Sequence, residues 1–341
     1  MSDEMLIQLA AGVALLALMA YAVFAGADFG GGVWDLFATG PRRSAQREAI
    51  AHAMGPVWEA NHVWLIFMLV VLFTCFPRGY APLGVALFVP FHLAVFGIML
   101  RGAAFIFREA GPRAPRSRLS RWGMVFGIAS LMSPILLGAA FGVLTEGKVR
   151  IDADGAVQPL PVWHWLSVYS IACGLLALST CAYLAAVYLT VETAGELRDD
   201  FRLRAIIAGT TTAGLATTVL LLACFEANWF FQQLISVRSW PVLAAGLLCF
   251  AASAWAVFGR RYHLSRIFAA GEIVLLLLGW GLAQQPYLVY PDMTFQEAAA
   301  PIPTVAFLLA TLPVGGLLLI PSLWLLYNVF KGSGIEDSPH P

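Results

Sequence analysis

Charged residues are scarce in this chain. Only 12% of its 341 residues are Asp, Glu, Lys or Arg, whereas a soluble domain carries about 25%. With 60% hydrophobic residues and a mean hydropathy of +0.79, too little polar surface remains to coat a water-soluble globule. Lys plus Arg and Asp plus Glu both number 20, so the net charge is zero and no nucleic-acid partner is indicated. Lipid is therefore the expected solvent.

Cysteine patterns typical of metal sites and disulfide frameworks are missing too. The five cysteines lie inside apolar runs and none forms a C-x-x-C pair, so neither zinc binding nor a disulfide framework is indicated. They are interpreted as small packing residues. The acidic start, Met-Ser-Asp-Glu-Met, lacks the basic region of a cleavable signal. The first apolar run is therefore expected to persist as a helix.

Long apolar runs are what the sequence has in abundance. A membrane helix needs about 20 mostly apolar residues. Nine runs meet this length, near residues 7–26, 53–76, 82–103, 122–144, 164–190, 205–226, 240–259, 267–284 and 304–328. The prediction is an all-α membrane protein with about nine transmembrane helices, forming a single integral membrane domain over residues 1–341.

Basic residues predict how these helices are oriented. Of the 20 Lys and Arg residues, fifteen fall in the loops on one side of the nine spans and four on the other. Arg101 is the remaining one and lies inside a span. Because loops rich in Lys and Arg stay in the cytoplasm, we expect the N-terminus outside and the C-terminus inside. An odd number of spans agrees with this split.

Asp28 stands in a glycine-rich stretch that closes the first span, G-A-D-F-G-G-G at 26–32. A charged group in hydrocarbon costs about 2.5–3.5 kcal/mol on insertion scales, which makes each one a functional candidate. Three consecutive glycines disfavour a regular helix, so Asp28 is expected beside irregular backbone. It is alternatively a capping or turn aspartate. Asp35, seven residues further, either shares a helix face with Asp28 or is a solvated loop acid, and the loop is favoured.

The second span begins with a cluster of polar and aromatic residues, G-P-V-W-E-A-N-H-V-W at 55–64. Glu59 and His62 are i, i+3 neighbours on one helix face. An interfacial aromatic belt would explain Trp58 and Trp64, but not the Glu, Asn and His between them. A functional role for Glu59 and His62 is favoured over a belt alone.

Arg101 lies at the same predicted depth, in the segment L-R-G-A-A-F-I-F-R-E at 100–109. Three helix ends thus bring Asp28, Glu59 and Arg101 to one level of the membrane. A neighbouring arginine lowers the pKa of a carboxyl group, whereas burial raises it. Such a balance suits a proton relay. Two alternatives are a structural ion pair and snorkelling of Arg101 to the headgroups. The proton-path candidates are Glu59, Asp28, Arg101 and His62; no residue is predicted to be catalytic or to bind metal.

Histidines are poorly placed for haem ligation. His92 alone lies near the middle of a span, while the other five lie near helix ends or in loops. Two histidines facing each other at one depth are therefore not indicated, and His92 is interpreted as a packed, hydrogen-bonded residue. Glu272, toward the cytoplasmic end of the eighth span, is a further polar anchor without an assigned role.

Taken together, these segments resemble subunit II of the cytochrome bd-type quinol oxidases, including the cyanide-insensitive type. The resemblance runs through the whole chain. It covers the nine spans and five strings in order, namely G-A-D-F-G-G-G, G-P-V-W-E-A-N-H-V-W, C-F-P-R-G-Y, L-R-G-A-A-F-I-F-R-E and G-W-G-L-A-Q-Q-P-Y-L. The second and fourth strings are the most specific.

The resemblance implies a fold of two four-helix bundles plus one additional helix. It also implies a haem-free subunit that stabilises a partner, subunit I, which carries two haems b and haem d and oxidises quinol. The family's cytoplasmic proton path passes an acid at the position of Glu59. Family members commonly have Asp there and another Asp at the position of Ala25, so this chain lacks one candidate carboxylate. A structural quinone and small single-span accessory subunits are further partners that the family admits.

The leading hypothesis is therefore a subunit of a quinol oxidase in the bacterial inner membrane, inactive alone, that assists proton uptake for oxygen reduction. A proton-coupled secondary transporter is the alternative, but it needs a substrate site near the midplane, where this sequence is nearly all apolar. A self-sufficient membrane cytochrome using His92 is a third. A reduced-minus-oxidised spectrum of the isolated chain distinguishes the first from the third.

Overall fold

The computed structural model is almost entirely helical. It describes residues 2–110, 120–152 and 154–332, with side chains over the same ranges except 54–60, 109–110, 323 and 326–332. The elements in chain order are α1 (Asp3–Leu36), α2 (Arg43–Cys75), α3 (Pro77–Ala86), α4 (Phe88–Ala110), α5 (Arg121–Glu146), α6 (Val168–Glu192), α7 (Gly195–Glu226), α8 (Asn228–Leu234), α9 (Trp240–Phe258), α10 (Tyr262–Gln284), β1 (Tyr287–Val289), β2 (Met293–Thr294), α11 (Phe295–Ala298) and α12 (Ile302–Gly332).

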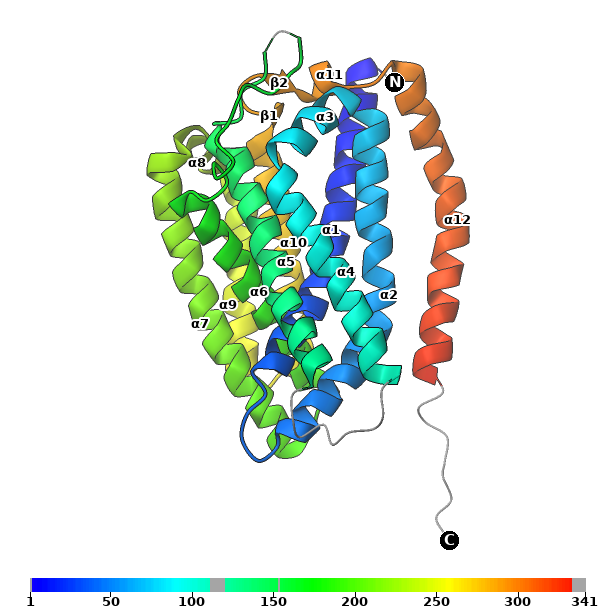
Figure 1. Ribbon diagram of the computed structural model, residues 1–341, viewed down its shortest axis with the longest axis vertical. Helices are drawn as coiled ribbons and strands as arrows, with labels where there is room; N and C mark the ends of the chain where they lie inside the picture. The colour runs from blue at the N-terminus through cyan, green and yellow to red at the C-terminus, as the bar shows by residue number, and fades with distance from the viewer. Residues whose placement is uncertain (1, 111–119, 153, 333–341) are drawn as a thin grey trace.

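The long helices form two four-helix groups. The first contains α1, α2, α4 and α5, and the second contains α6, α7, α9 and α10. The groups join where α1 packs against α6 and α10, and where α5 packs against α6. Helix α12 lies apart at the edge of the molecule and touches α2 and α1 (Figure 1). The architecture of two bundles plus one additional helix is confirmed.

Two ends of the molecule differ in character. The short turns α1–α2, α6–α7 and α9–α10 lie at one end, here named the arginine-rich end after the arginines at 42–43, 198 and 260–261. The N-terminus, α3, α8, the β-strands and α11 lie at the opposite end, the N-terminal end (Figure 1). Among the described residues, eight helices are long and apolar enough to cross a membrane, or nine if one bent pair counts as a span.

The bent pair corrects the predicted third span. Residues 82–86 belong to α3, which turns by 120° from Asn61–Cys75 of α2, and the span itself is α4, beginning at Phe88. Pro77 is the first residue of α3. Proline has no amide hydrogen to donate to the preceding turn and favours the first position of a new helix. A hydropathy count detects apolar length but not this change of direction.

Polar caps set several helix ends. Ser120 and Ser167 accept hydrogen bonds from Gly123 N at 3.0 Å and Ser170 N at 3.0 Å, at the starts of α5 and α6. Such side chains satisfy amide groups that have no partner within the helix. Helix α5 ends at Glu146 and is followed by Gly147, whose φ of 69° lies in the left-handed region that favours glycine. Most helices extend a few residues beyond the predicted spans.

The glycines around Asp28 do not interrupt α1, contrary to the expectation of irregular backbone. Instead they allow close helix packing. A Cβ on Gly30 would lie 1.9 Å from the backbone oxygen of Cys181 in α6, and one on Gly32 would lie 2.1 Å from Ser130 Oγ in α5. Tertiary contact thus overrides the low helix propensity of glycine, and the glycines bring α1 against both neighbours.

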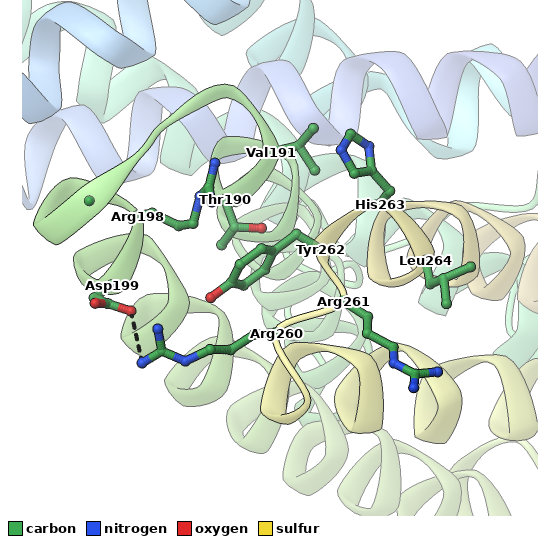
Figure 2. Close-up of a pocket in the computed structure, with 10 residues that line it drawn as sticks. Thr190, Val191, Arg198, Asp199, Arg260, Arg261, Tyr262, His263 and Leu264 are labelled. Atoms are coloured by element: carbon green, nitrogen blue, oxygen red, sulfur yellow. Dashed lines mark ion pairs between the residues drawn. The ribbon is translucent and has the colours of Figure 1, made fainter.

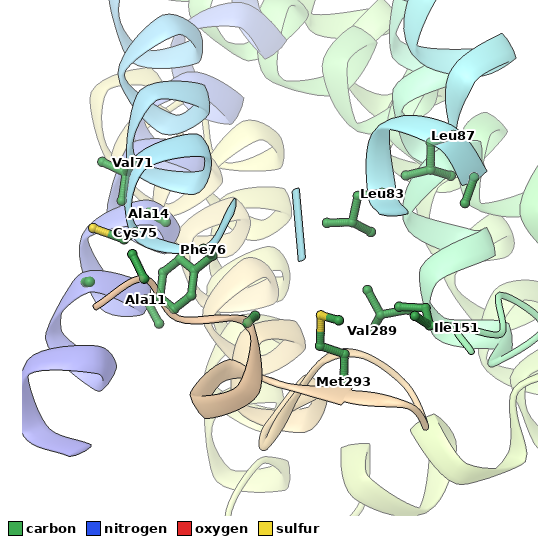
Figure 3. Close-up of a cluster of buried hydrophobic side chains, with 14 of the residues drawn as sticks. Ala11, Ala14, Val71, Cys75, Phe76, Leu83, Leu87, Ile151, Val289 and Met293 are labelled. Carbon is green, nitrogen blue, oxygen red and sulfur yellow. The ribbon is translucent and has the colours of Figure 1, made fainter. Parts of the chain in front are cut away.

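An apolar cluster closes the N-terminal end. It joins the end of α2 to α3, β1, β2 and α11, with Phe76 at its centre (Figure 3). Phe76 is fully buried and packs edge to face against Phe295, with ring centroids 5.6 Å apart. The amide of Ala300 donates to the backbone oxygen of Cys75 at 2.8 Å. Val149 and Ile151, from the loop after α5, belong to the same cluster as Val289 and Met293 from the loop after α10, so these two loops pack into one cap.

An ion pair links those two loops. Arg150 Nε and Nη2 donate to the two carboxylate oxygens of Asp292 at 2.7 and 2.8 Å, and Ile151 N donates to Asp292 Oδ2 at 2.8 Å. The hydrogen bond from Arg150, assisted by that from Ile151, holds the pKa of Asp292 below its usual value. The carboxylate of Asp292 therefore tethers one loop to the other in its charged form.

Acidification is expected to loosen this tether. Because the folded pKa of Asp292 is depressed, its contribution to stability is complete above the ordinary carboxyl value and is lost as the pH falls through the folded pKa. Amide hydrogen exchange at Ile151, corrected for intrinsic rates, should show lower protection at about pH 3 than at about pH 7. In Asp292→Asn, protection should already be low at neutral pH, and a pH response equal to that of the native chain would contradict the prediction.

Candidate functional site

Asp28 and Arg101 form a buried ion pair between α1 and α4. Only 1% of Asp28 and 2% of Arg101 is exposed. Arg101 Nη1 donates to Asp28 Oδ2 at 2.6 Å, and Nη2 donates to Oδ1 at 2.5 Å and to the backbone oxygen of Asp28 at 3.0 Å. This two-pronged geometry is the strongest form of arginine–carboxylate contact. Arg101 therefore does not snorkel, and Asp28 is not a helix cap.

The remaining faces of the Arg101 guanidinium are also occupied. Its Nε donates to Ser130 Oγ at 2.9 Å, and that hydroxyl donates to the backbone oxygen of Phe126 at 2.7 Å. The rings of Phe126 and Phe29 lie 4.7 and 5.3 Å from the guanidinium carbon. Cation–π contacts of this kind strengthen when water is excluded. Arg101 is thus held from α1 and α5 together.

Asn61 extends the cluster to α2. Its Nδ2 donates to Asp28 Oδ2 at 2.8 Å, so its amide oxygen points the other way and meets His62 Nδ1. Since that oxygen is an acceptor, the hydrogen bond assigns the proton to Nδ1 of His62. Asn61 is buried and His62 is partly buried. A continuous set of hydrogen bonds therefore runs from Ser130 through Arg101, Asp28 and Asn61 to His62.

A second ion pair lies nearer the arginine-rich end. Arg108 donates through Nη1 and Nη2 to the two oxygens of Asp35, both at 2.9 Å. Arg47 Nε also donates to the backbone oxygen of Asp35 at 3.3 Å. The expectation of a solvated loop acid is wrong, because Asp35 is completely buried within α1.

The sequence contained a signal for this second pair that our reading missed. Asp28 and Asp35 are seven residues apart, and so are Arg101 and Arg108. Residues seven apart lie on one face of a helix, so two parallel helices can repeat the same pairing two turns later. Tyr21 continues the face by another seven residues; it is buried, and its hydroxyl has no hydrogen-bond partner among the described residues.

Of the four predicted proton-path residues, three are brought together. Asp28 and Arg101 are in direct contact, and His62 reaches them through Asn61. The side chain of Glu59, the fourth, lies outside the described residues. Asn61 is predicted from the sequence only as part of the polar motif that opens the second span, and no local pattern singles out Ser130.

Two other sequence candidates lie away from this cluster. His92 is exposed on α4, where its Nδ1 meets the backbone oxygen of Phe88 at 2.7 Å. Glu272 is buried in α10, and its Oε2 has no hydrogen-bond partner among the described residues. In the described part of the chain, no group of three or more His, Cys, Asp or Glu side chains could hold a metal ion.

Comparison with known proteins gives consistent matches. The family model "Cytochrome bd terminal oxidase subunit II" matches residues 6–330. Cytochrome bd ubiquinol oxidase subunit 2 of Bacillus subtilis (strain 168) is 31% identical over 238 residues, which are 69% of this chain and 67% of that one. Cytochrome bd-I ubiquinol oxidase subunit 2 of Escherichia coli (strain K12) is 27% identical over 198 residues, 57% of this chain and 51% of that one.

A solved structure has the same fold. A chain in the structure of bd oxidase from Geobacillus thermodenitrificans superposes with a TM-score of 0.79 at 24% sequence identity. The match covers 96% of this chain and 98% of that chain. The arrangement of helices described above is therefore shared along nearly the whole length of both chains.

Proposed function

We propose that this chain, which belongs to the cytochrome bd terminal oxidase subunit II family, assists proton uptake. Membership of this family makes it a multi-pass inner-membrane subunit of a bacterial quinol oxidase. In this proposal it binds no haem itself, supports the haem-bearing subunit I, and helps protons move from the cytoplasm to the place where oxygen becomes water. The observation that carries the proposal is the buried hydrogen-bonded set around Asp28, Arg101, Asn61 and His62.

The proposal puts the arginine-rich end in the cytoplasm. The turns and helix ends there carry the arginines at 42–43, 47, 108, 121, 198 and 260–261, in accord with the tendency of basic segments to remain inside. Asp35 and Arg108 then lie near the cytoplasmic surface. Asp28 follows about 10 Å deeper and Tyr21 about 10 Å beyond that, from the helical rise over seven residues. One face of α1 thus offers polar groups at regular intervals into the membrane.

The members of this set are suited to different roles. The Asp28 carboxylate accepts hydrogen bonds from both terminal nitrogens of Arg101 and from Asn61. Loss of its charge would forfeit the charge assistance of all three bonds, so Asp28 and Arg101 serve as positioning residues. They fix Asn61, which in turn orients the ring of His62. His62, and Glu59 one turn earlier in α2, are the proposed proton carriers.

The haems are assigned to the partner subunit. Each oxygen molecule reduced to two water molecules takes up four protons and four electrons, and quinol oxidised on the outer side releases its protons there. Uptake from the opposite side separates charge across the membrane without transport by a pump. A haem band in the spectrum of this chain purified alone would contradict the assignment.

Replacement of His62 by glutamine is expected to slow oxygen reduction by the assembled complex. Glutamine keeps a polar side chain but cannot carry a proton. The rate should fall by about tenfold, less than the roughly 100-fold that positioned proton-transfer groups contribute at the low end. Oxygen consumption with quinol as donor, measured across pH, reports the loss, and the haem spectrum reports assembly. Glu59→Gln should behave in the same way.

His92→Gln is the matched control, because His92 is exposed on α4 and bonds only to its own helix in the contacts described. It should keep the native rate and pH profile. Unchanged turnover at every pH in both His62→Gln and Glu59→Gln would remove α2 from the proton path. Loss of the haems together with activity would instead favour a purely structural role.

A further inference from the structure

A basic cavity opens at the arginine-rich end of the second four-helix group. It has a volume of about 530 Å³ and lies where the α6–α7 turn faces the α9–α10 turn (Figure 2). It is remote from the Asp28 cluster, which lies in the first group. Its lining includes Arg198, Asp199, Arg260, Arg261, Tyr262 and His263.

The charge of this lining favours an anion. Three arginines and a histidine line the cavity together with a single carboxylate, that of Asp199. Arg260 Nη2 meets Asp199 Oδ1 at 3.5 Å, but the two side chains are 63% and 52% exposed. Exposed pairs of this kind contribute little, so Asp199 only partly neutralises the cavity. An excess of two positive charges remains without counting His263.

The arginines are held in place by contacts with backbone and aromatic rings. Arg198 Nε donates to the backbone oxygen of Thr193 at 2.7 Å, and its guanidinium carbon lies 5.3 Å from the ring centroid of Tyr262. Arg261 lies 5.0 Å from the ring of Trp255. Arg260 has a φ of 57°, in the left-handed region that arginine rarely adopts. The side chains of Arg198 and Arg261 are thus fixed by these contacts, while their terminal nitrogens can still donate hydrogen bonds to a ligand.

A buried hydroxyl provides an independent observation. Tyr262 is only 9% exposed, yet its Oη has no hydrogen-bond partner among the described residues. Figure 2 shows the ring between Arg198 and Arg260, with its hydroxyl on the side of Asp199. A buried polar atom without a partner costs free energy. An acceptor bound in the cavity would satisfy this donor.

We propose that this cavity binds the phosphate group of an anionic ligand, supplied by the headgroup of a membrane phospholipid. Planar guanidinium groups match phosphate oxygens in a two-pronged fashion, and Tyr262 adds a neutral donor. In the orientation proposed above, the cavity lies at the headgroups of the inner leaflet, where basic pockets between helices bind anionic lipids. Val191 and Leu264 give its lining an apolar part beside the charges.

The test measures lipid retention by the complete oxidase. The complex is stripped in detergent, titrated with phosphatidylglycerol or phosphatidylcholine, and the bound lipids are counted by native mass spectrometry. Preferential binding of phosphatidylglycerol should weaken about tenfold in Arg260→Gln/Arg261→Gln, as expected for the loss of charge-assisted hydrogen bonds. Tyr262→Phe, which removes only the hydroxyl, should weaken it less, by about threefold.

Arg121→Gln is the matched control, since Arg121 is an exposed arginine at the same end of the first group. It should retain native binding. Equal affinity for the two lipids, or equal losses in Arg121→Gln and the double variant, would overturn the proposal. Inorganic phosphate is the second probe. If phosphate fails to displace phosphatidylglycerol, the lipid headgroup is the source of the bound phosphate group. If phosphate displaces the lipid at millimolar concentration, soluble phosphate is the source instead, and the assignment to a lipid is wrong. Failure of the proton-uptake variants leaves this result unaffected.

Discussion

Replacing Arg101 with methionine should destabilise the protein by about 3–5 kcal/mol, the cost of breaking a buried ion pair by removing one partner. The carboxylate of Asp28, 1% exposed, would lose its two hydrogen bonds from Arg101 and stay in the membrane interior with only that from Asn61. Thermal unfolding of the detergent-solubilised complex, together with the yield of assembled complex, measures the effect.

The double variant Asp28→Leu/Arg101→Met separates two explanations. If the loss arises from an uncompensated charge, removing both partners should recover most of the stability, because apolar replacement of a whole buried pair is often neutral. A double variant as unstable as Arg101→Met would mean that Arg101 acts mainly through Ser130 and the aromatic rings. Arg121→Met, at an exposed position, should unfold like the native complex.

Gly30→Ala is expected to have the second largest effect, at least about 1–3 kcal/mol from overpacking. The new Cβ would lie 1.9 Å from the backbone oxygen of Cys181 and 2.7 Å from Ala185 Cβ. Backbone cannot rotate away as a side chain can, so α1 and α6 must separate. Because Gly30 is two residues from Asp28, the shift should also disturb the buried pair. Thermal unfolding of the complex again gives the measurement.

Gly12→Ala provides a control within the same helix. A Cβ there would have no atom within 4 Å, so the higher helix propensity of alanine should leave stability unchanged or raise it by about 0.5–1 kcal/mol. If both alanine variants unfold at the same temperature, close contact between α1 and α6 at Gly30 is not required for stability.

The spans and the meeting of Asp28 with Arg101 could be predicted from the sequence, because each depends on local hydropathy and depth. The bend before α3 could not. Residues 82–86 are apolar enough to pass for the start of a span, but α3, which begins at Pro77, packs against Leu288 and Ala298 across the end of the bundle. Hydropathy indicates whether a segment lies in an apolar environment, but it does not indicate the direction of the helix axis.

The other misreadings have a tertiary origin. Three glycines predict a broken helix when α1 is considered alone. In the folded protein, their lack of a side chain lets α5 and α6 pack closely against α1. Asp35 reads as a loop acid until Arg108, 73 residues away in sequence, is known to lie beside it. In both cases the deciding partner belongs to another helix, so no local pattern contains it.

The repeated pairing of Asp28 with Arg101 and of Asp35 with Arg108 has a mechanical consequence. A slide of α1 along α4 by even one turn would break both salt bridges at once and leave four charged groups without their ion-pair partners. The two helices therefore behave as a single rigid strut. Any axial displacement during turnover must then occur in segments outside this strut, such as α12, which packs at the edge of the molecule against α1 and α2.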